Sequence, residues 1–167
     1  MAVSEASDFF IKGDASTSVG LRFEIWNGAL LAVREHPILG IGYRQRQTFI
    51  ESKINSGDLK PEVLSMRHAH SDYFEALQSR GIPGLILLLL LYAVPLMIFL
   101  RGLKETQDEK LFAALGGTLM ITGYMIYSLT EVPMYNGLPL IFFIIATSLF
   151  IGILKHSPVA TDANYSR

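Results

Sequence analysis

The second half of the chain is dominated by apolar residues, in three runs without a charged residue: Gly81 to Leu100, Leu111 to Thr130 and Val132 to Leu154. As an α-helix rising about 1.5 Å per residue, each run is long enough to cross the roughly 30 Å of a bilayer's hydrocarbon core. Buried core helices of a large soluble protein would be expected alongside amphipathic partners, and none accompany these runs. The pattern predicts three transmembrane helices, at about residues 82–100, 111–130 and 136–154.

Basic residues distinguish the two short connections between these runs. The first connection contains three of them: Arg101, Lys104 and Lys110. The second, residues 131–136, contains none. Because basic residues in short loops stay in the cytoplasm, the first connection and the tail, residues 155–167, are predicted to be cytoplasmic. Residues 1–80 then form an extracytoplasmic loop domain.

The start of the chain, "MAVSEASDFFIKGDASTS", has no basic segment followed by an apolar one, and so no recognisable export signal. Translocation of the extracytoplasmic loop domain then requires transmembrane helices that precede it in the protein. We therefore expect the C-terminal part of a longer polytopic protein. The predicted fold class is all-α: a fragment of a polytopic membrane helical bundle, in which a loop domain with amphipathic helices precedes three transmembrane helices.

Within the first 80 residues, helical periodicity is clearest in "SVGLRFEIWNGALLAVREHP". Ser18 is a plausible N-cap, and the helix should stop at His36 because the residue before a proline is biased away from helical angles. One apolar stripe follows helical spacing: Leu21, Ile25, Ala29 and Ala32. Residues 36–49 are predicted to form a turn and residues 51–65 a polar connection. A second short helix, at about residues 71–79, should lead through Gly81 into the first span.

Composition narrows the function classes only a little. The formal net charge is -1, which argues against a strongly basic nucleic-acid binder, and no nucleic-acid partner is expected. Cysteine is absent, which is compatible with any compartment.

A cluster of titratable residues, "SMRHAHSDYFEALQSR", stops just short of the first span. Its "HAHSDY" resembles the histidine-rich run of metallohydrolases but lacks the final histidine. The other histidines are His36 and His156, and His156 is predicted to lie across the membrane, so no metal site is expected. The alternative is that one histidine acts as a general base while arginines hold an anion. Arginines available for this purpose are Arg22, Arg44, Arg46, Arg67 and Arg80.

The order of the motifs resembles the O-antigen ligase and O-antigen polymerase family of bacterial membrane glycosyltransferases. In that family an Arg is followed four residues later by Trp, then by Ala, Pro-x-x-Gly-x-Gly and an aromatic residue. After a polar gap come a His, an aromatic residue three positions later, and Gly-x-x-Gly at the start of a span. The matching residues here are Arg22, Trp26, Ala29, Pro37, Gly40, Gly42, Phe49, His70, Ser71, Tyr73, Gly81 and Gly84. Ser71 departs from the Asn that usually follows the His, and the family's earlier spans are not in this chain.

The resemblance implies a glycan transfer from an undecaprenyl-pyrophosphate carrier to an acceptor hydroxyl, on the acceptor glycan or lipid A core, without cofactor, metal or nucleotide. It implies a multi-pass protein of the bacterial inner (cytoplasmic) membrane, in contact with membrane lipids. His70 would be the catalytic base and Arg22 would bind the pyrophosphate. Weaker candidates for substrate binding are Arg67, His68 and Tyr73.

Two alternatives stay open on the sequence. The chain could be a non-catalytic membrane scaffold whose loop binds lipid headgroups through its basic residues. Within the family, ligase, polymerase and protein glycosyltransferase carry the same motifs, and the sugar is not specified.

Overall fold

The computed structural model describes Ile11 and residues 17–156, and every regular element within them is helical. The α-helices are α2 (Ser18–Glu35), α3 (Arg46–Asn55), α4 (Asp72–Gly102), α5 (Asp108–Tyr127) and α6 (Gly137–Lys155). Two short 3-10 helices are η1 (Tyr43–Gln45) and η2 (Pro61–Ser65). The predicted all-α class is confirmed. Most of the predicted cytoplasmic tail, residues 157–167, lies outside the described residues.

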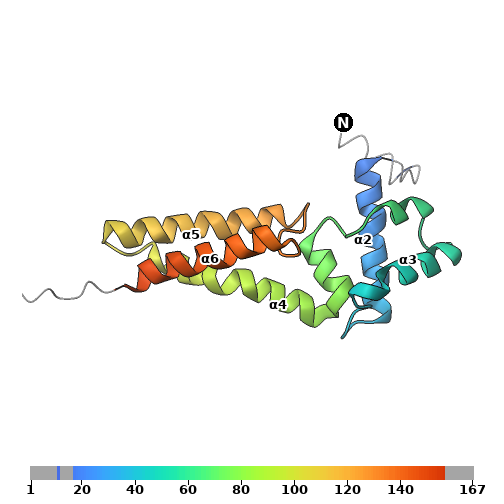
Figure 1. Cartoon of the computed structure of the whole chain (residues 1–167), viewed down its shortest axis with the longest axis horizontal. Coiled ribbons are helices and arrows are strands. Elements are labelled where there is room, and N and C mark those ends of the chain that lie inside the picture. Colours follow the sequence, from blue (N-terminus) through green and yellow to red (C-terminus); the bar gives the residue numbers. More distant parts are fainter. Residues whose placement is uncertain (1–10, 12–16, 157–167) are drawn as a thin grey trace, which may run out of the picture.

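The molecule has two parts (Figure 1). We call residues 17–80 the head, which holds α2, α3 and the start of α4, and residues 82–156 the bundle, which holds the rest of α4 with α5 and α6. The bundle helices run side by side, and α2 crosses their end. The polar connections at that end therefore face the head.

Helix α2 follows the prediction closely. It ends at Glu35, two residues before Pro37, and the inward stripe of Ile25, Ala29 and Ala32 is fully buried. The N-cap prediction was wrong by one residue, because the Thr17 hydroxyl accepts a hydrogen bond from the Gly20 amide at 3.0 Å.

Helix α3 and η2 lie where the sequence predicted a turn and a polar connection, so that prediction was wrong. These segments and the link between them carry few apolar residues, but three of these are buried: Ile50, Leu59 and Val63 pack with Ile25 of α2 in a core of their own. Single apolar residues in a polar segment give no clear periodicity. Tertiary packing on α2 accounts for α3 better than its local pattern does.

A sharp bend at Gly81 divides α4 into a head section and a bundle section. Gly81 has φ 67° and ψ −163°, outside the helical region. A Cβ there would lie 2.5 Å from the Pro37 carbonyl oxygen. The turn after α2 is fixed to the bend, since the Ile82 amide donates to Pro37 O at 2.8 Å and the Ile41 amide to Gln78 O at 2.8 Å. The two glycine motifs of the sequence thus meet in space.

The bundle has an apolar interior and an apolar exterior. Tyr92, Phe99, Ile121 and Phe143 are its buried centre. Among the described helices, α4 and α6 are long and apolar enough to cross a membrane. Only 28% of the most apolar stretch of α4 and 6% of that of α6 is buried, so these are not core helices of a soluble domain.

Helix α5 is not one of these two helices, and its first turn carries Asp108 and Glu109. The structure nevertheless packs it along α4 and α6 as the third member of the bundle (Figure 1). Its predicted role as a third span, and the predicted orientation of the bundle, stay predictions.

Candidate active site

The connection between α5 and α6 is fastened to the first residues of α4. The Asp72 carboxylate accepts hydrogen bonds from the Ser128 hydroxyl at 2.8 Å and the Met134 amide at 3.0 Å. The Asp72 amide donates to the carbonyls of Ser128 and Glu131, at 3.0 and 3.2 Å. Asp72 and Ser128 are both buried. These four hydrogen bonds fix residues 128–134 over the start of α4.

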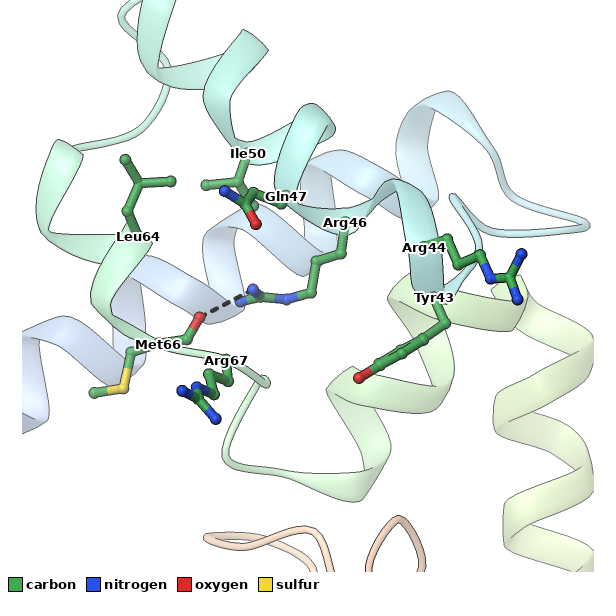
Figure 2. A pocket seen from close by; sticks show the side chains of 8 residues that line it. All are labelled: Tyr43, Arg44, Arg46, Gln47, Ile50, Leu64, Met66 and Arg67. Atoms are coloured by element: carbon green, nitrogen blue, oxygen red, sulfur yellow. Dashed lines mark hydrogen bonds between the residues drawn. The ribbon is translucent and has the colours of Figure 1, made fainter.

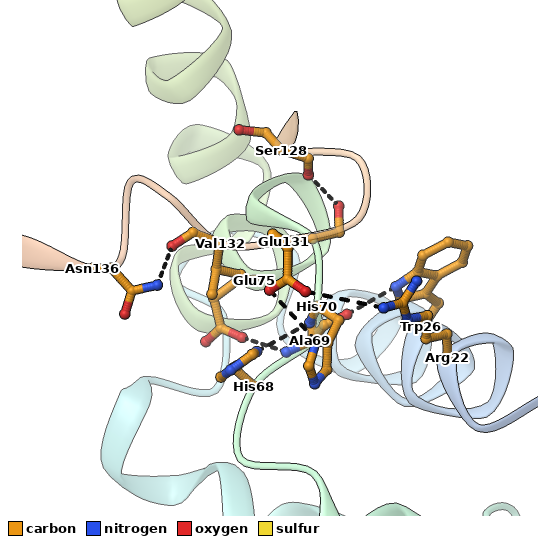
Figure 3. A network of polar contacts seen from close by, with 11 residues as sticks. Arg22, Trp26, His68, Ala69, His70, Glu75, Ser128, Glu131, Val132 and Asn136 are labelled. Carbon is orange, nitrogen blue, oxygen red and sulfur yellow. Dashed lines mark hydrogen bonds and ion pairs between the residues drawn. The ribbon is translucent and has the colours of Figure 1, made fainter. Parts of the chain in front are cut away.

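This fastening places Glu131 between two residues of the head (Figure 3). Glu131 Oε1 lies 4.0 Å from Arg22 Nη2, and Oε2 lies 3.7 Å from His70 Nδ1. The three side chains are partly exposed, at 37% for Arg22, 36% for Glu131 and 22% for His70. The site therefore opens to the surface, and its three members come from α2, the 66–71 segment and the α5–α6 connection.

His70 is held in an unusual backbone conformation. Its φ is 49°, and it is the one non-glycine residue with positive φ among those the structure describes. Its amide faces His68 Nδ1 at 3.4 Å, and the two imidazole rings lie 4.2 Å apart. Left-handed backbone at a non-glycine residue stores strain and is found disproportionately at functional sites.

His68 has a lowered pKa. Burial is the main cause, and the neighbouring His70 adds to it, while Glu75 and Glu131 oppose it. The lowered pKa favours the neutral imidazole, which suits its Nδ1 as an acceptor beside the His70 amide.

The residue between the two histidines, Ala69, is anchored on both sides. Trp26 Nε1 donates to its carbonyl at 2.9 Å, and its amide donates to Glu75 Oε2 at 2.9 Å. The Trp26 ring stacks on Phe74 with centroids 4.9 Å apart. The spacing of Arg22 and Trp26 now has a physical meaning, because one turn of α2 both supports the histidine segment and presents the arginine.

The remaining predicted residues lie elsewhere. Tyr73 points into the bundle, where its hydroxyl donates to the Met125 carbonyl at 2.9 Å, and this contact explains it without a substrate. Arg67 is exposed on the other side of the histidine segment, in a separate pocket described below. Glu131 was absent from the predicted site. Its position at the predicted outer end of a span, facing the same side as His70, was the available signal.

No three or more His, Cys, Asp or Glu side chains among the described residues form a group that could hold a metal ion. The two histidines of "HAHSDY" are close, but Glu131 is engaged with Arg22 as well as His70. The metallohydrolase alternative therefore gains no support from the described residues.

Fold and site together define a class: a membrane-associated helical protein that holds an arginine, a histidine and a carboxylate at the mouth of apolar helices. The family model for the O-antigen ligases matches residues 1–89, more than half of the chain, and the chain belongs to this family. The chain is also 27% identical over 150 residues to an uncharacterized protein of Haemophilus influenzae. That match covers 90% of this chain and 38% of the relative, so the chain spans well under half of the relative's length.

Proposed function

We propose that the protein transfers a glycan from an undecaprenyl-pyrophosphate carrier to an acceptor hydroxyl, in the synthesis of lipopolysaccharide or a related surface polysaccharide. The observation that carries the proposal is the meeting of Arg22 and His70 on Glu131. The carrier's tail lies in the bilayer and its pyrophosphate at the interface. A site at the mouth of α4 stands at the depth where the two reactants meet.

Each site residue has a chemical role in this reaction. His70 accepts the proton of the acceptor hydroxyl, whose oxygen attacks the anomeric carbon of the carrier-linked sugar. The bond from that carbon to the pyrophosphate oxygen breaks, and the electron pair leaves with the pyrophosphate. Arg22 stabilises the negative charge that the leaving pyrophosphate gains.

Glu131 acts as a positioning residue. With Nδ1 of His70 directed at its carboxylate, Nε2 is the nitrogen that remains to take the proton. The separation of 3.7 Å exceeds hydrogen-bond length, and such contacts in substrate-free sites tighten when substrate binds.

The site should face the periplasm, and the protein should reside in the bacterial inner membrane. The basic connection between α4 and α5 supports this orientation, because it lies at the end of the bundle opposite the head (Figure 1).

Two substitutions test the proposal because their effects should differ in kind. Arg22→Lys keeps the charge but loses the two-pronged contact, so it should weaken productive carrier binding by about 1.5 to 3 kcal/mol. His70→Gln keeps hydrogen bonding but not basicity, so it should leave carrier binding nearly intact and slow transfer roughly 100-fold to 10,000-fold. Carrier binding and glycan transfer are measured for each variant in the protein as its gene encodes it, with a chelator present.

Arg34→Gln is the matched control, since Arg34 is exposed at the far end of α2. Transfer at the native rate by His70→Gln would remove the base mechanism, whereas absence of transfer by the unaltered protein would favour the scaffold alternative. Abolition of native transfer by the chelator would instead require a metal.

A further inference from the structure

A basic pocket of about 480 Å³ lies in the head, between the start of α3 and the segment after η2 (Figure 2). Its lining includes Arg44, Arg46 and Arg67, and none of the lining residues is acidic. The pocket is separate from the Arg22, Glu131 and His70 site, although Arg67 directly precedes His68 in the chain.

Arg46 is the unusual member of this pocket. It is only 9% exposed, and Nη1 donates to the Met66 carbonyl at 3.0 Å. Nε and Nη2 are also buried, and neither has a hydrogen-bond partner in the part of the chain that the structure describes. Figure 2 shows the guanidinium pointing between Met66 and Tyr43 into the pocket. A buried cation with unsatisfied donors is costly unless an anion or another acceptor meets it.

The carboxylate whose charge acts most on Arg46, that of Glu75, does not supply the missing hydrogen-bond acceptor. Burial lowers the pKa of Arg46, and Glu75 partly opposes the effect through its charge. Glu75 Oε2 is already engaged by the Ala69 amide and Gln78 Nε2, each at 2.9 Å. Arg46 is therefore held by one hydrogen bond, while its Nε and Nη2 are buried at the pocket wall without an acceptor.

The lining points to the chemistry of that ligand. A guanidinium whose buried N–H groups lack an acceptor matches the oxygens of a phosphate or carboxylate, and exposed Arg67 adds a second positive charge. The Tyr43 ring beside Arg46 offers an apolar face with a hydroxyl, suited to a sugar ring. Within the head, α3 lies away from the apolar bundle, which favours a water-soluble group over a lipid headgroup (Figure 1).

We propose that this pocket binds a sugar-borne oxyanion, a phosphate or carboxylate, on the glycan substrate. The inference rests on the proposed function for the nature of the substrate, but the pocket's anion binding is independent of transfer. Met66 and Arg67 line the pocket and lead directly to His68, so a glycan held there extends toward His70.

The test is a titration of the protein as its gene encodes it, in phosphatidylcholine nanodiscs, with mannose 6-phosphate, mannose and inorganic phosphate, followed by ligand-observed NMR. Mannose 6-phosphate should bind more tightly than either mannose or inorganic phosphate. Arg46→Lys and Arg67→Gln should each weaken its binding about 10-fold, the loss of a charge-assisted contact. Arg34→Gln should bind like the unaltered protein. Because Arg67 is exposed, Arg67→Gln should fold normally, and it tests the proposal even if Arg46→Lys fails to fold.

Unchanged affinity in Arg67→Gln would overturn the proposal. So would inorganic phosphate binding as tightly as the sugar phosphate, which indicates a free-phosphate site, or displacement of the sugar phosphate by phosphatidylglycerol nanodiscs, which indicates a headgroup site. Repeating the titration in His70→Gln separates the two proposals. The His70→Gln variant should bind mannose 6-phosphate as tightly as the unaltered protein. If the glycan-transfer proposal fails, the binding result for the pocket is unaffected.

Discussion

Glu131 lets the side chains of Arg22 and His70 approach the same point, and the weakness of its contacts is useful. The exposed ion pair between Arg22 and Glu131, at 4.0 Å, contributes at most about 1 kcal/mol. A pyrophosphate carries more charge than one carboxylate and can replace Glu131 as the partner of Arg22. Glu131 then remains for His70 alone. Under the proposed function, the free site would exchange partners when the carrier binds.

At the same scale, His68 makes the stability of the head depend on pH. Its pKa is lowered from the ordinary 6.5, so the unfolded chain binds more protons than the folded one between the folded pKa and 6.5. Stability should therefore fall as the pH drops through 6.5. Thermal melting of the protein between pH 5 and 8 measures this, and His68→Asn should flatten the dependence. His36→Asn, at an exposed position, is the control; an identical slope in both variants would contradict the assignment.

At the scale of elements, the bend in α4 joins the head to the bundle. Gly40 and Gly81 both have positive φ, of 64° and 67°. A Cβ on Gly40 would lie 2.6 Å from the Arg80 amide nitrogen, so the turn and the bend touch through their backbones. The bend lets α4 start beside α2 and then continue along the bundle.

Gly81→Ala should accordingly destabilise the protein by about 1 to 3 kcal/mol, because it adds both backbone strain and a clash with Pro37. Thermal unfolding in nanodiscs measures the loss. Gly123→Ala is the matched control, since a Cβ there meets nothing within 4 Å and alanine favours a helix. Equal melting temperatures for Gly81→Ala and the unaltered protein would show that the bend is not required.

The elements also show how far the sequence could be interpreted. Periodicity predicted α2 and the apolar runs predicted the bundle, because both signals are local. Helix α3 was missed, since it depends on Ile50 reaching the core beside Ile25. Glu131 could be interpreted from the sequence as orienting a basic group, but a plain interfacial carboxylate was preferred, because its place beside His70 depends on Asp72 fastening a connection more than 50 residues away in sequence. Arg22 and His70 were predicted because they belong to spaced motifs.

For the whole molecule, the arrangement of charge predicts the orientation in the membrane. The chain contains no cysteine, so a single introduced cysteine reports its own side of the membrane. Glu62→Cys, exposed in the head, should react with an impermeant maleimide in cells whose outer membrane has been opened. Lys104→Cys, exposed between α4 and α5, should react only after the inner membrane is permeabilised. Labelling of Lys104→Cys in intact spheroplasts would show that the orientation is opposite to the predicted one.

The head and the bundle contribute to one site only if Glu131 acts through His70. A double-mutant cycle of glycan transfer, with Glu131→Gln and His70→Gln alone and together, measures this coupling directly. Glu131→Gln should slow transfer about 10-fold in the unaltered protein and have no further effect once His70 is Gln. Glu109→Gln, exposed at the other end of α5, should have no effect in either background. If the Glu131 and His70 effects simply multiply, the two residues work independently and the single site proposed for them does not exist.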